Sequence, residues 1–236
     1  MGNPRGIIIT LIATVLLIAG LGLWVAYRNG EITLPYSDAY GTSTEEYDYP
    51  RALDGDTNQT MNMEKTNETN PVVVLKTNKG DIKIELYSDL MPITAGNFLK
   101  LAEENFYDKT KFHRVIEGFM VQGGDPNSKG NDPSTYGTGG PGYAIADEHI
   151  ADPKLSNMRG TISMANSGPN SGGSQFFINL VDNTFLDFDK EPLSSKHPVF
   201  GHVIEGMDVV DAISQVSTGA RDIPVEPVIV NDVVVE

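Results

Sequence analysis

Short apolar runs separated by glycine-rich turns fill residues 71–236, and this pattern restricts the fold more than any other feature of the chain. The first two runs are Val72–Leu75 and Asp81–Leu86, and the turn Thr77–Gly80 joins them. In the second run isoleucine and leucine alternate with charged residues, which is typical of a half-buried strand. The two runs therefore predict a β-hairpin.

The rest of this region carries similar signals. Two short helices are expected because apolar residues recur at helical spacing, one at Ala95–Glu104 with Thr94 as its N-cap and one at Met207–Ser214. Many short strands and only two helices predict a mostly β domain, a closed antiparallel barrel with helical caps. The further expected strands are Gly118–Gln122, Thr161–Met164, Gln175–Leu180, Val199–Val203, Val225–Val230 and Asp232–Val235.

The amino-terminal segment has a different composition. No charged residue occurs between Arg5 and Arg28, and about 20 apolar residues in a helix span the hydrocarbon core of a bilayer, which is roughly 30 Å thick. We therefore expect a transmembrane helix over about residues 6–27, within an anchor of residues 1–28. A cleaved signal peptide is the alternative, although the run is long for a signal core and Gly20–Gly22 is a poor cleavage site.

Residues 29–70 carry nine acidic residues against two basic ones. Their sparse apolar residues follow neither a strand nor a helix period, which predicts a disordered acidic linker. Arg5 before the apolar run and this acidic linker after it favour a cytoplasmic amino terminus, with the domain of residues 71–236 outside the cytoplasm. We therefore expect a single-pass membrane protein.

Composition and motif spacing argue against several kinds of site. The chain has no cysteine and its four histidines lack metal-ligand spacing, so we expect no metal site. A formal net charge of −15 argues against nucleic-acid binding, which needs a basic surface. Gly137–Gly142 matches the GxGxxG dinucleotide pattern, but Pro141 and the loop-like residues before it remove the strand–turn–helix context that this motif requires.

Three segments carry a more specific signal: Phe112–Pro126 reads FHRVIEGFMVQGGDP, Ser163–Ile178 reads SMANSGPNSGGSQFFI, and Val199–Gly201 reads VFG. In combination they closely resemble the cyclophilin family of peptidyl-prolyl cis-trans isomerases, and prokaryotic members in particular. The resemblance covers residues 71–236 and implies an eight-stranded antiparallel barrel closed by two helices, with a proline-binding groove on its outer face. It also implies proline-containing polypeptides as substrates, and catalysis without a metal or an organic cofactor.

The reaction itself suggests which side chain matters most. Rotation about an X–Pro bond breaks no covalent bond, but it faces a barrier of about 18–20 kcal/mol. An enzyme must therefore bind the twisted amide more tightly than either planar form. The proline nitrogen regains a lone pair in the twisted state, so a fixed cation that donates a hydrogen bond to it is selective for that state. Arg114 is the candidate donor, because a guanidinium is planar and permanently charged.

The family pattern implies roles for the other positions. It makes Gln122 the side chain that orients the Arg114 guanidinium, and it assigns the carbonyl of the residue before proline to the Asn166 backbone. The apolar floor that grips the proline ring would consist of Phe119, Met120, Phe177 and Leu186. The remaining substrate-binding positions that the resemblance implies are His113, Ala165, Gln175, Phe185 and His197.

Some positions depart from the family pattern. Glu117 stands where proline is frequent, and it would weaken Arg114 if the two side chains met. Phe185 stands where many eukaryotic members carry tryptophan, so we expect weak cyclosporin binding and retained isomerase activity. The stretch Phe188–Lys196 is longer than the usual family turn, which makes the match at His197 the least direct of the set.

Two other functions stay open from the residues alone. A non-catalytic module could bind proline-containing peptides in the same groove, and it would show affinity without rate enhancement. A barrel that carries a small ligand inside is the other alternative, although small barrels are filled by their own side chains. We favour a monomeric isomerase domain that assists the folding of extended protein segments at the membrane surface.

Overall fold

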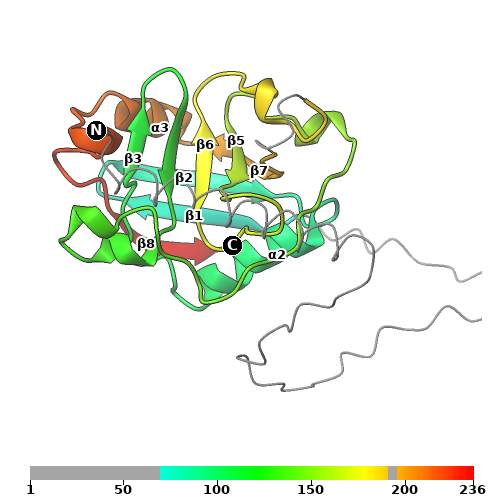
Figure 1. Cartoon of the computed structure of the whole chain (residues 1–236), viewed down its shortest axis with the longest axis horizontal. Coiled ribbons are helices and arrows are strands. Elements are labelled where there is room, and N and C mark those ends of the chain that lie inside the picture. The colour runs from blue at the N-terminus through cyan, green and yellow to red at the C-terminus, as the bar shows by residue number, and fades with distance from the viewer. Residues whose placement is uncertain (1–69, 191–195) are drawn as a thin grey trace, which may run out of the picture. The chain divides into compact units, whose positions relative to one another are not determined.

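Antiparallel strands form one curled sheet in the computed structural model, which describes residues 70–190 and 196–236 (Figure 1). The strands are β1 (Val72–Thr77), β2 (Gly80–Leu86), β3 (Arg114–Ile116), β4 (Met120–Gly123), β5 (Thr161–Met164), β6 (Phe176–Asn179), β7 (Val199–Glu205) and β8 (Val230–Val235). Hydrogen-bonded neighbours follow the order β3-β4-β6-β5-β7-β2-β1-β8. The helices are α2 (Pro92–Glu103) and α3 (Met207–Ser214). The predicted mostly β class with two helices is confirmed for this part of the chain.

Several predicted features fall outside the ranges that the structure describes. These are the transmembrane helix over residues 6–27, the linker of residues 29–70 apart from its last residue, and the middle of the long stretch Phe188–Lys196. None of the helices in residues 70–190 and 196–236 has the length and hydropathy of a bilayer-spanning helix.

The predicted hairpin is confirmed in β1 and β2. The two strands pair from Val72 opposite Glu85 to Thr77 opposite Gly80. Gly80 has a φ of +133°, and a Cβ atom at this position would lie 2.8 Å from Cγ2 of Val209 in α3. The turn therefore requires glycine here, both for its backbone conformation and for the close approach of α3.

The sheet curls, but strand pairing does not close it. Within the described residues its edge strands, β3 and β8, form no ladder with each other. Instead the chain before β3 bonds to the chain that enters β8: Lys109 N–H donates to the Val230 carbonyl (2.7 Å), and Phe112 N–H donates to the Val228 carbonyl (2.9 Å). The prediction of a closed eight-stranded barrel was therefore wrong in this respect, because the three-residue β3 begins only after this crossing.

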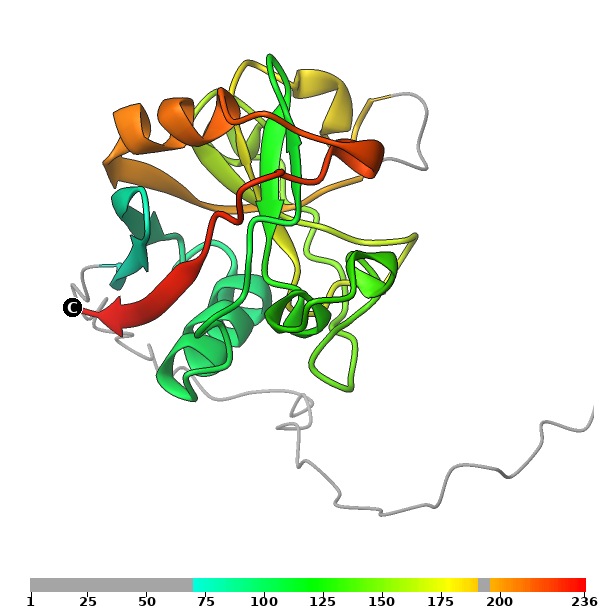
Figure 2. The ribbon, with the colours of Figure 1, turned by 90° about the vertical axis from the view of Figure 1, so that its left-hand side faces the viewer.

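The two helices cover opposite ends of the curled sheet (Figures 1 and 2). Phe98 of α2 enters the centre of the core, where its ring centroid lies 4.8 Å from that of Tyr107, 5.4 Å from Phe176 and 5.3 Å from Phe200. The apolar face of α3 packs on β2, β3 and β4. The core is thus filled by side chains of the sheet and both helices.

The predicted cap of α2 was wrong. The helix begins at Pro92, where the absent N–H costs nothing, and Met91 at the N-cap makes no side-chain hydrogen bond to the helix. The carboxylate of Glu148 accepts hydrogen bonds from Ile93 N–H (3.0 Å) and Thr94 N–H (2.6 Å) instead. A loop 55 positions farther along the chain therefore caps this helix, and Thr94 lies inside its first turn.

The other predicted elements differ in accuracy. Thr161–Met164 and Met207–Ser214 coincide with β5 and α3. The run Val225–Val230 is mostly outside the sheet, because only its last residue joins β8. Strand β3 was not predicted, since its three residues are too few to display a period.

Candidate active site

Three of the expected site residues lie in one row across neighbouring strands. Arg114 of β3 lies opposite Gln122 of β4, and Gln122 lies opposite Phe177 of β6. Directly opposed residues of antiparallel strands project from the same face of a sheet. The register of β3, β4 and β6 therefore brings the candidate cation, its expected orienting group and part of the expected floor onto one surface.

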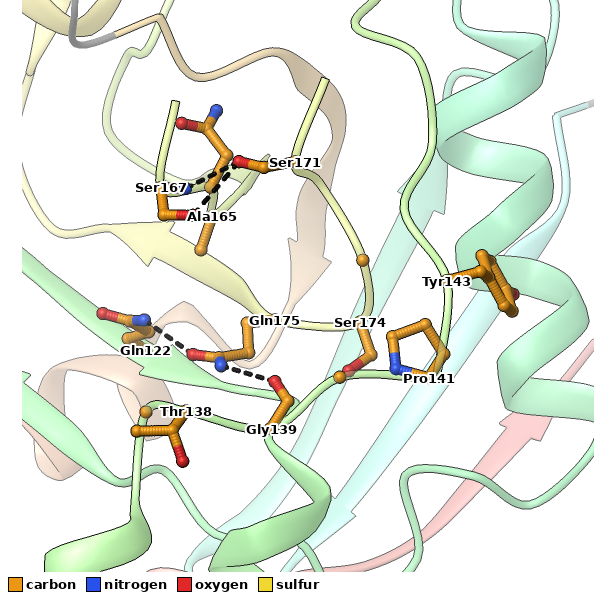
Figure 3. Close-up of a pocket in the computed structure, with 14 residues that line it drawn as sticks. Gln122, Thr138, Gly139, Pro141, Tyr143, Ala165, Ser167, Ser171, Ser174 and Gln175 are labelled. Atoms are coloured by element: carbon orange, nitrogen blue, oxygen red, sulfur yellow. Dashed lines mark hydrogen bonds between the residues drawn. The ribbon is translucent and has the colours of Figure 1, made fainter. Parts of the chain in front are cut away.

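A chain of side-chain hydrogen bonds starts at Arg114. Its Nη1 donates to Oε1 of Gln122 at 3.5 Å, a long contact. Gln122 Nε2 then donates to Oε1 of Gln175 (3.1 Å), and Gln175 Nε2 donates to the carbonyl of Gly139 (2.8 Å) (Figure 3). The two glutamines therefore tie the guanidinium to the loop that contains Gly139.

The carboxylate of Asp125 holds the loop that contains Gly139 in place. Its side chain is fully buried and accepts hydrogen bonds from the backbone N–H groups of Asn127 and Gly137. A Cβ atom at Gly139 would lie 2.2 Å from Oδ1 of Asp125, so only glycine permits this close approach. Asp125 lies in the segment Phe112–Pro126, but the sequence predicted no role for it.

The expected apolar floor forms a cluster of its own beside the row. Met120, Phe177 and Leu186 are its buried members. Phe119 is partly buried against them, and its ring stacks on that of Phe185 with centroids 6.1 Å apart. Phe185 is 52% exposed, so it forms the rim of the cluster instead of its base. This cluster is separate from the main core, and Phe119 and Phe185 are its more exposed edge.

A cavity of about 310 Å³ lies beside the row and the cluster, which it meets at Gln122 and Ala165 (Figure 3). Neither Arg114 nor the buried members of the cluster line it. Four of the expected site residues line it, namely Gln122, Ala165, Asn166 and Gln175. The remaining walls come from the loop 137–141, three serines, Tyr143 and Gly173. No lining residue in the described ranges carries a charged side chain. The cavity therefore offers hydrogen bonds and van der Waals contact to a neutral group.

Asn166 lies at the edge of this cavity with its side chain engaged. Its Nδ2 donates to the Lys196 carbonyl (2.7 Å), and its Oδ1 accepts from Gly168 N–H (3.3 Å). Its own main-chain N–H and C=O make no hydrogen bond to any residue of ranges 70–190 and 196–236. The side chain is thus held at both polar atoms, and the main-chain N–H and C=O are left without a partner among the described residues.

His197 packs against Phe177 of the apolar cluster. Its ring lies edge-on to Phe177 with centroids 5.3 Å apart, and its Nδ1 is 3.1 Å from the Met164 carbonyl. Because a carbonyl can only accept, Nδ1 carries the proton and Nε2 is left as the acceptor. Burial lowers the pKa of His197, although the contact with Met164 opposes this shift. The imidazole is therefore neutral at pH 7.

His113 lies beneath the site and not on its surface. Its side chain is only 4% exposed, and burial lowers its pKa. Neither ring nitrogen has a hydrogen-bond partner within the described residues. The buried ring packs beneath the loop at Gly137, where a Cβ atom would lie 3.8 Å from His113 Nε2. Within the described residues it does not line the cavity.

The contacts of two acidic residues near Arg114 differ from the expectation. Glu117 does not meet Arg114, because its Oε1 accepts a hydrogen bond from Gln215 Nε2 (3.0 Å) at the end of α3. Asp222 does meet it: its Oδ2 lies 3.6 Å from Nε of Arg114. Sequence reasoning missed Asp222, and no local pattern could have connected it with a residue so distant in the chain.

Comparison with known proteins agrees with this geometry. A family model described as "Cyclophilin type peptidyl-prolyl cis-trans isomerase/CLD" matches residues 72–235. Peptidyl-prolyl cis-trans isomerase B of Escherichia coli (strain K12) is 45% identical over 172 residues, which are 70% of this chain and 99% of that relative. A protein of Streptococcus pyogenes serotype M6, whose name joins a phosphatase to a peptidyl-prolyl cis-trans isomerase, is 39% identical over 71% of this chain, but the chain covers only 39% of it.

A solved structure also has the same fold. It is a Cryptosporidium parvum cyclophilin type peptidyl-prolyl cis-trans isomerase, crystallised in the presence of the dipeptide Ala-Pro. The two chains superpose with a TM-score of 0.60 at 32% identity, over 70% of this chain and 98% of that one. The sequence match spans almost all of the folded region, and the fold agrees with it. The chain therefore belongs to the cyclophilin-type peptidyl-prolyl cis-trans isomerases.

Proposed function

We propose that this chain accelerates X–Pro rotation in extended polypeptides by presenting Arg114 to the proline nitrogen above an apolar floor. The observation that carries the proposal is the row Arg114, Gln122 and Phe177, which places a permanent cation beside a separate apolar cluster. The isomerase activity itself is that of the family. The roles of the individual residues are the proposal.

The size of the catalytic task shows that Arg114 cannot act alone. Uncatalysed exchange takes about 10–100 s, and bringing it to milliseconds requires roughly 10⁴–10⁵-fold, or about 5.5–7 kcal/mol of differential binding. A hydrogen bond from a charged donor contributes about 1.5–3 kcal/mol. The remainder must come from contacts that hold the substrate on both sides of the rotating bond.

The site offers such contacts. The proline ring would lie on Met120, Phe177 and Leu186, and Phe119 would close one side. The backbone of Asn166 would bind the carbonyl of the residue before proline, because its N–H has no partner within the described residues. With the ring and the carbonyl both held, binding energy favours the twisted amide over the planar forms.

A protease-coupled assay on an Ala-Pro peptide tests this proposal. We expect the full chain to accelerate isomerisation, and Arg114→Ala to lower kcat/KM by about 10- to 100-fold, the loss of one charge-assisted hydrogen bond. Peptide binding, measured by titration, should change much less. Affinity without acceleration in the unmodified chain would instead support a non-catalytic peptide-binding module.

We further propose that residues 1–28 anchor the enzyme in a membrane as a single-pass helix. The support is the absence of charge between Arg5 and Arg28 and the acidic composition of residues 29–70, which would act as a tether. The amino terminus would be cytoplasmic, and the isomerase would assist folding on the other side as a monomeric domain. Protease digestion of intact cells tests this topology, since only an external domain would be cleaved.

Phe185 supports a proposal on inhibitor sensitivity. It stands where many eukaryotic family members carry tryptophan, and here its exposed ring stacks on Phe119. We therefore expect this chain to bind cyclosporin weakly. At this position it resembles prokaryotic members of the family more than eukaryotic ones. Inhibition titrations with cyclosporin, on the unmodified chain and on Phe185→Trp, test the role of this position.

A further inference from the structure

The turn that carries Asp222 has a geometry that its local sequence does not explain. It comprises the short 3₁₀ segment η5 (Ala220–Asp222), which packs on β3. Arg221 and Asp222 have φ values of 61° and 59°, so two consecutive non-glycine residues adopt the left-handed conformation. Such residues are strained and persist only where surrounding contacts hold them.

Those contacts come from a distant loop. The guanidinium of Arg221 donates to the carbonyls of Pro133 (3.1 Å), Ser134 (3.3 Å) and Tyr136 (2.6 Å). Within the turn, Gly219 N–H also donates to the Ile223 carbonyl (2.8 Å). The turn is therefore fixed from outside and from within, and its strained backbone directs the Asp222 side chain toward Arg114.

We propose that Asp222 is a positioning residue for Arg114, an inference that rests on the proposed function of Arg114. Gln122 holds the guanidinium only through a long 3.5 Å contact at Nη1, and the Arg114 side chain is 43% exposed. The carboxylate of Asp222 forms an ion pair at a different nitrogen, with Oδ2 3.6 Å from Nε. Two contacts on different nitrogens define the plane of a guanidinium, whereas one contact does not.

The arrangement leaves the reacting side of Arg114 free. Nε faces Asp222 and one N–H of Nη1 faces Gln122, so Nη2 and the second Nη1 proton can reach a substrate nitrogen. Of the acids in the described ranges, Asp222 is the one within 4.0 Å of an Arg114 nitrogen. Both partners are about half exposed, so water screens their attraction and Arg114 keeps most of its influence on a ligand.

The test is Asp222→Asn in the full chain, because asparagine tolerates the left-handed conformation and removes only the charge. We expect kcat/KM to fall by about two- to fivefold, the size of a half-exposed ion pair. The loss should lie in kcat with KM unchanged, since the residue orients the donor and does not touch the peptide. The ¹H–¹⁵N resonance of Arg114 Nε–H should also exchange faster with water in this variant.

Asp232→Asn is a matched control. It removes the ion pair of Lys76 with Asp232, which has the same 3.6 Å separation and side chains 47% and 46% exposed, but which lies on β1 and β8 away from Arg114. We expect its kcat and its Arg114 Nε–H signal to equal those of the unmodified chain. If Asp222→Asn does not fold, Asp222→Gly replaces it, because glycine adopts this φ without strain.

The outcomes separate the two proposals. If Arg114→Ala is nearly inactive while the Asp222 variant keeps full kcat and an unchanged Nε–H signal, the positioning role is refuted and the role of Arg114 stands. A rise in kcat would also refute it, because the carboxylate would then weaken Arg114. If Arg114→Ala keeps full activity, the proposed mechanism itself is wrong. A further twofold or larger loss from Asp222→Asn in the Arg114→Ala background would show a general structural role and overturn the inference.

Discussion

The cap of α2 allows a quantitative prediction about stability. The amino-terminal end of this helix has four positions whose N–H groups lack an intrahelical partner, and the structure accounts for each of them. Met91 N–H at the N-cap donates to the Tyr87 carbonyl (2.7 Å). Pro92 has no N–H, and the N–H groups of Ile93 and Thr94 both donate to Glu148. Replacing Glu148 by alanine leaves these two donors without a partner in the protein and removes a negative charge from the positive end of the helix.

We expect Glu148→Ala to lower the free energy of unfolding by about 1–2 kcal/mol, the usual cost of losing a charged or polar cap. For a domain of this size each kcal/mol lowers Tm by roughly 2–4 °C, so the expected shift is about 2–8 °C. Glu148→Gln should lose about half as much, because its single amide oxygen still accepts one bond without the charge. Urea and thermal unfolding followed by circular dichroism measure both effects.

Glu104→Gln, at the C-cap of the same helix, is the control. It removes only an exposed pair with Lys100, whose charged atoms are 4.0 Å apart, and such pairs contribute about 0.5 kcal/mol or less. If Glu148→Ala were no more destabilising than this control, the capping role of Glu148 would be refuted.

Two other predictions concern residues near the site. Burial lowers the pKa of His197, so the unfolded chain binds more protons than the folded chain between the folded pKa and the usual value of about 6.5. The contribution of this group to stability is complete above about pH 6.5 and is lost as the pH falls from there to the lower, folded pKa. Thermal unfolding from pH 7.5 to 5 should show this decline, and His197→Gln should reduce it. Asp187 accepts hydrogen bonds from Asn157 N–H (2.7 Å), Asn157 Nδ2 (2.9 Å) and Ser156 Oγ (2.6 Å) next to Leu186. Asp187→Ala should cost about 1–3 kcal/mol of stability and raise KM, and an unchanged KM would separate this network from the floor.

The elements that the sequence predicted well are those whose signal is local. The β1–β2 hairpin follows from a period of two around a glycine-containing turn, and α3 follows from apolar residues at helical spacing. The pairing of Arg114 with Gln122 could also be predicted, because both residues lie within one short segment and belong to adjacent strands.

Other features could not be predicted, because their cause lies in contacts between distant residues. The cap of α2 is one, since Thr94 has a good capping side chain but packing places it inside the helix, and Glu148 replaces it from a separate loop. The crossing of Lys109 and Phe112 with the chain that enters β8 is another, because it depends on how far the sheet curls.

By itself, the sequence determined the strand and helix periods, the chemistry of Arg114 and its neighbours, and a family resemblance that the comparisons bear out. These follow from backbone preferences and side-chain types, which act over a few residues. Only the tertiary structure decided that Glu117 faces away from Arg114 and that Asp222, from a strained turn held by Arg221, faces toward it. Such pairings depend on the packing of the whole domain, because the chain must first fold before residues so far apart can meet.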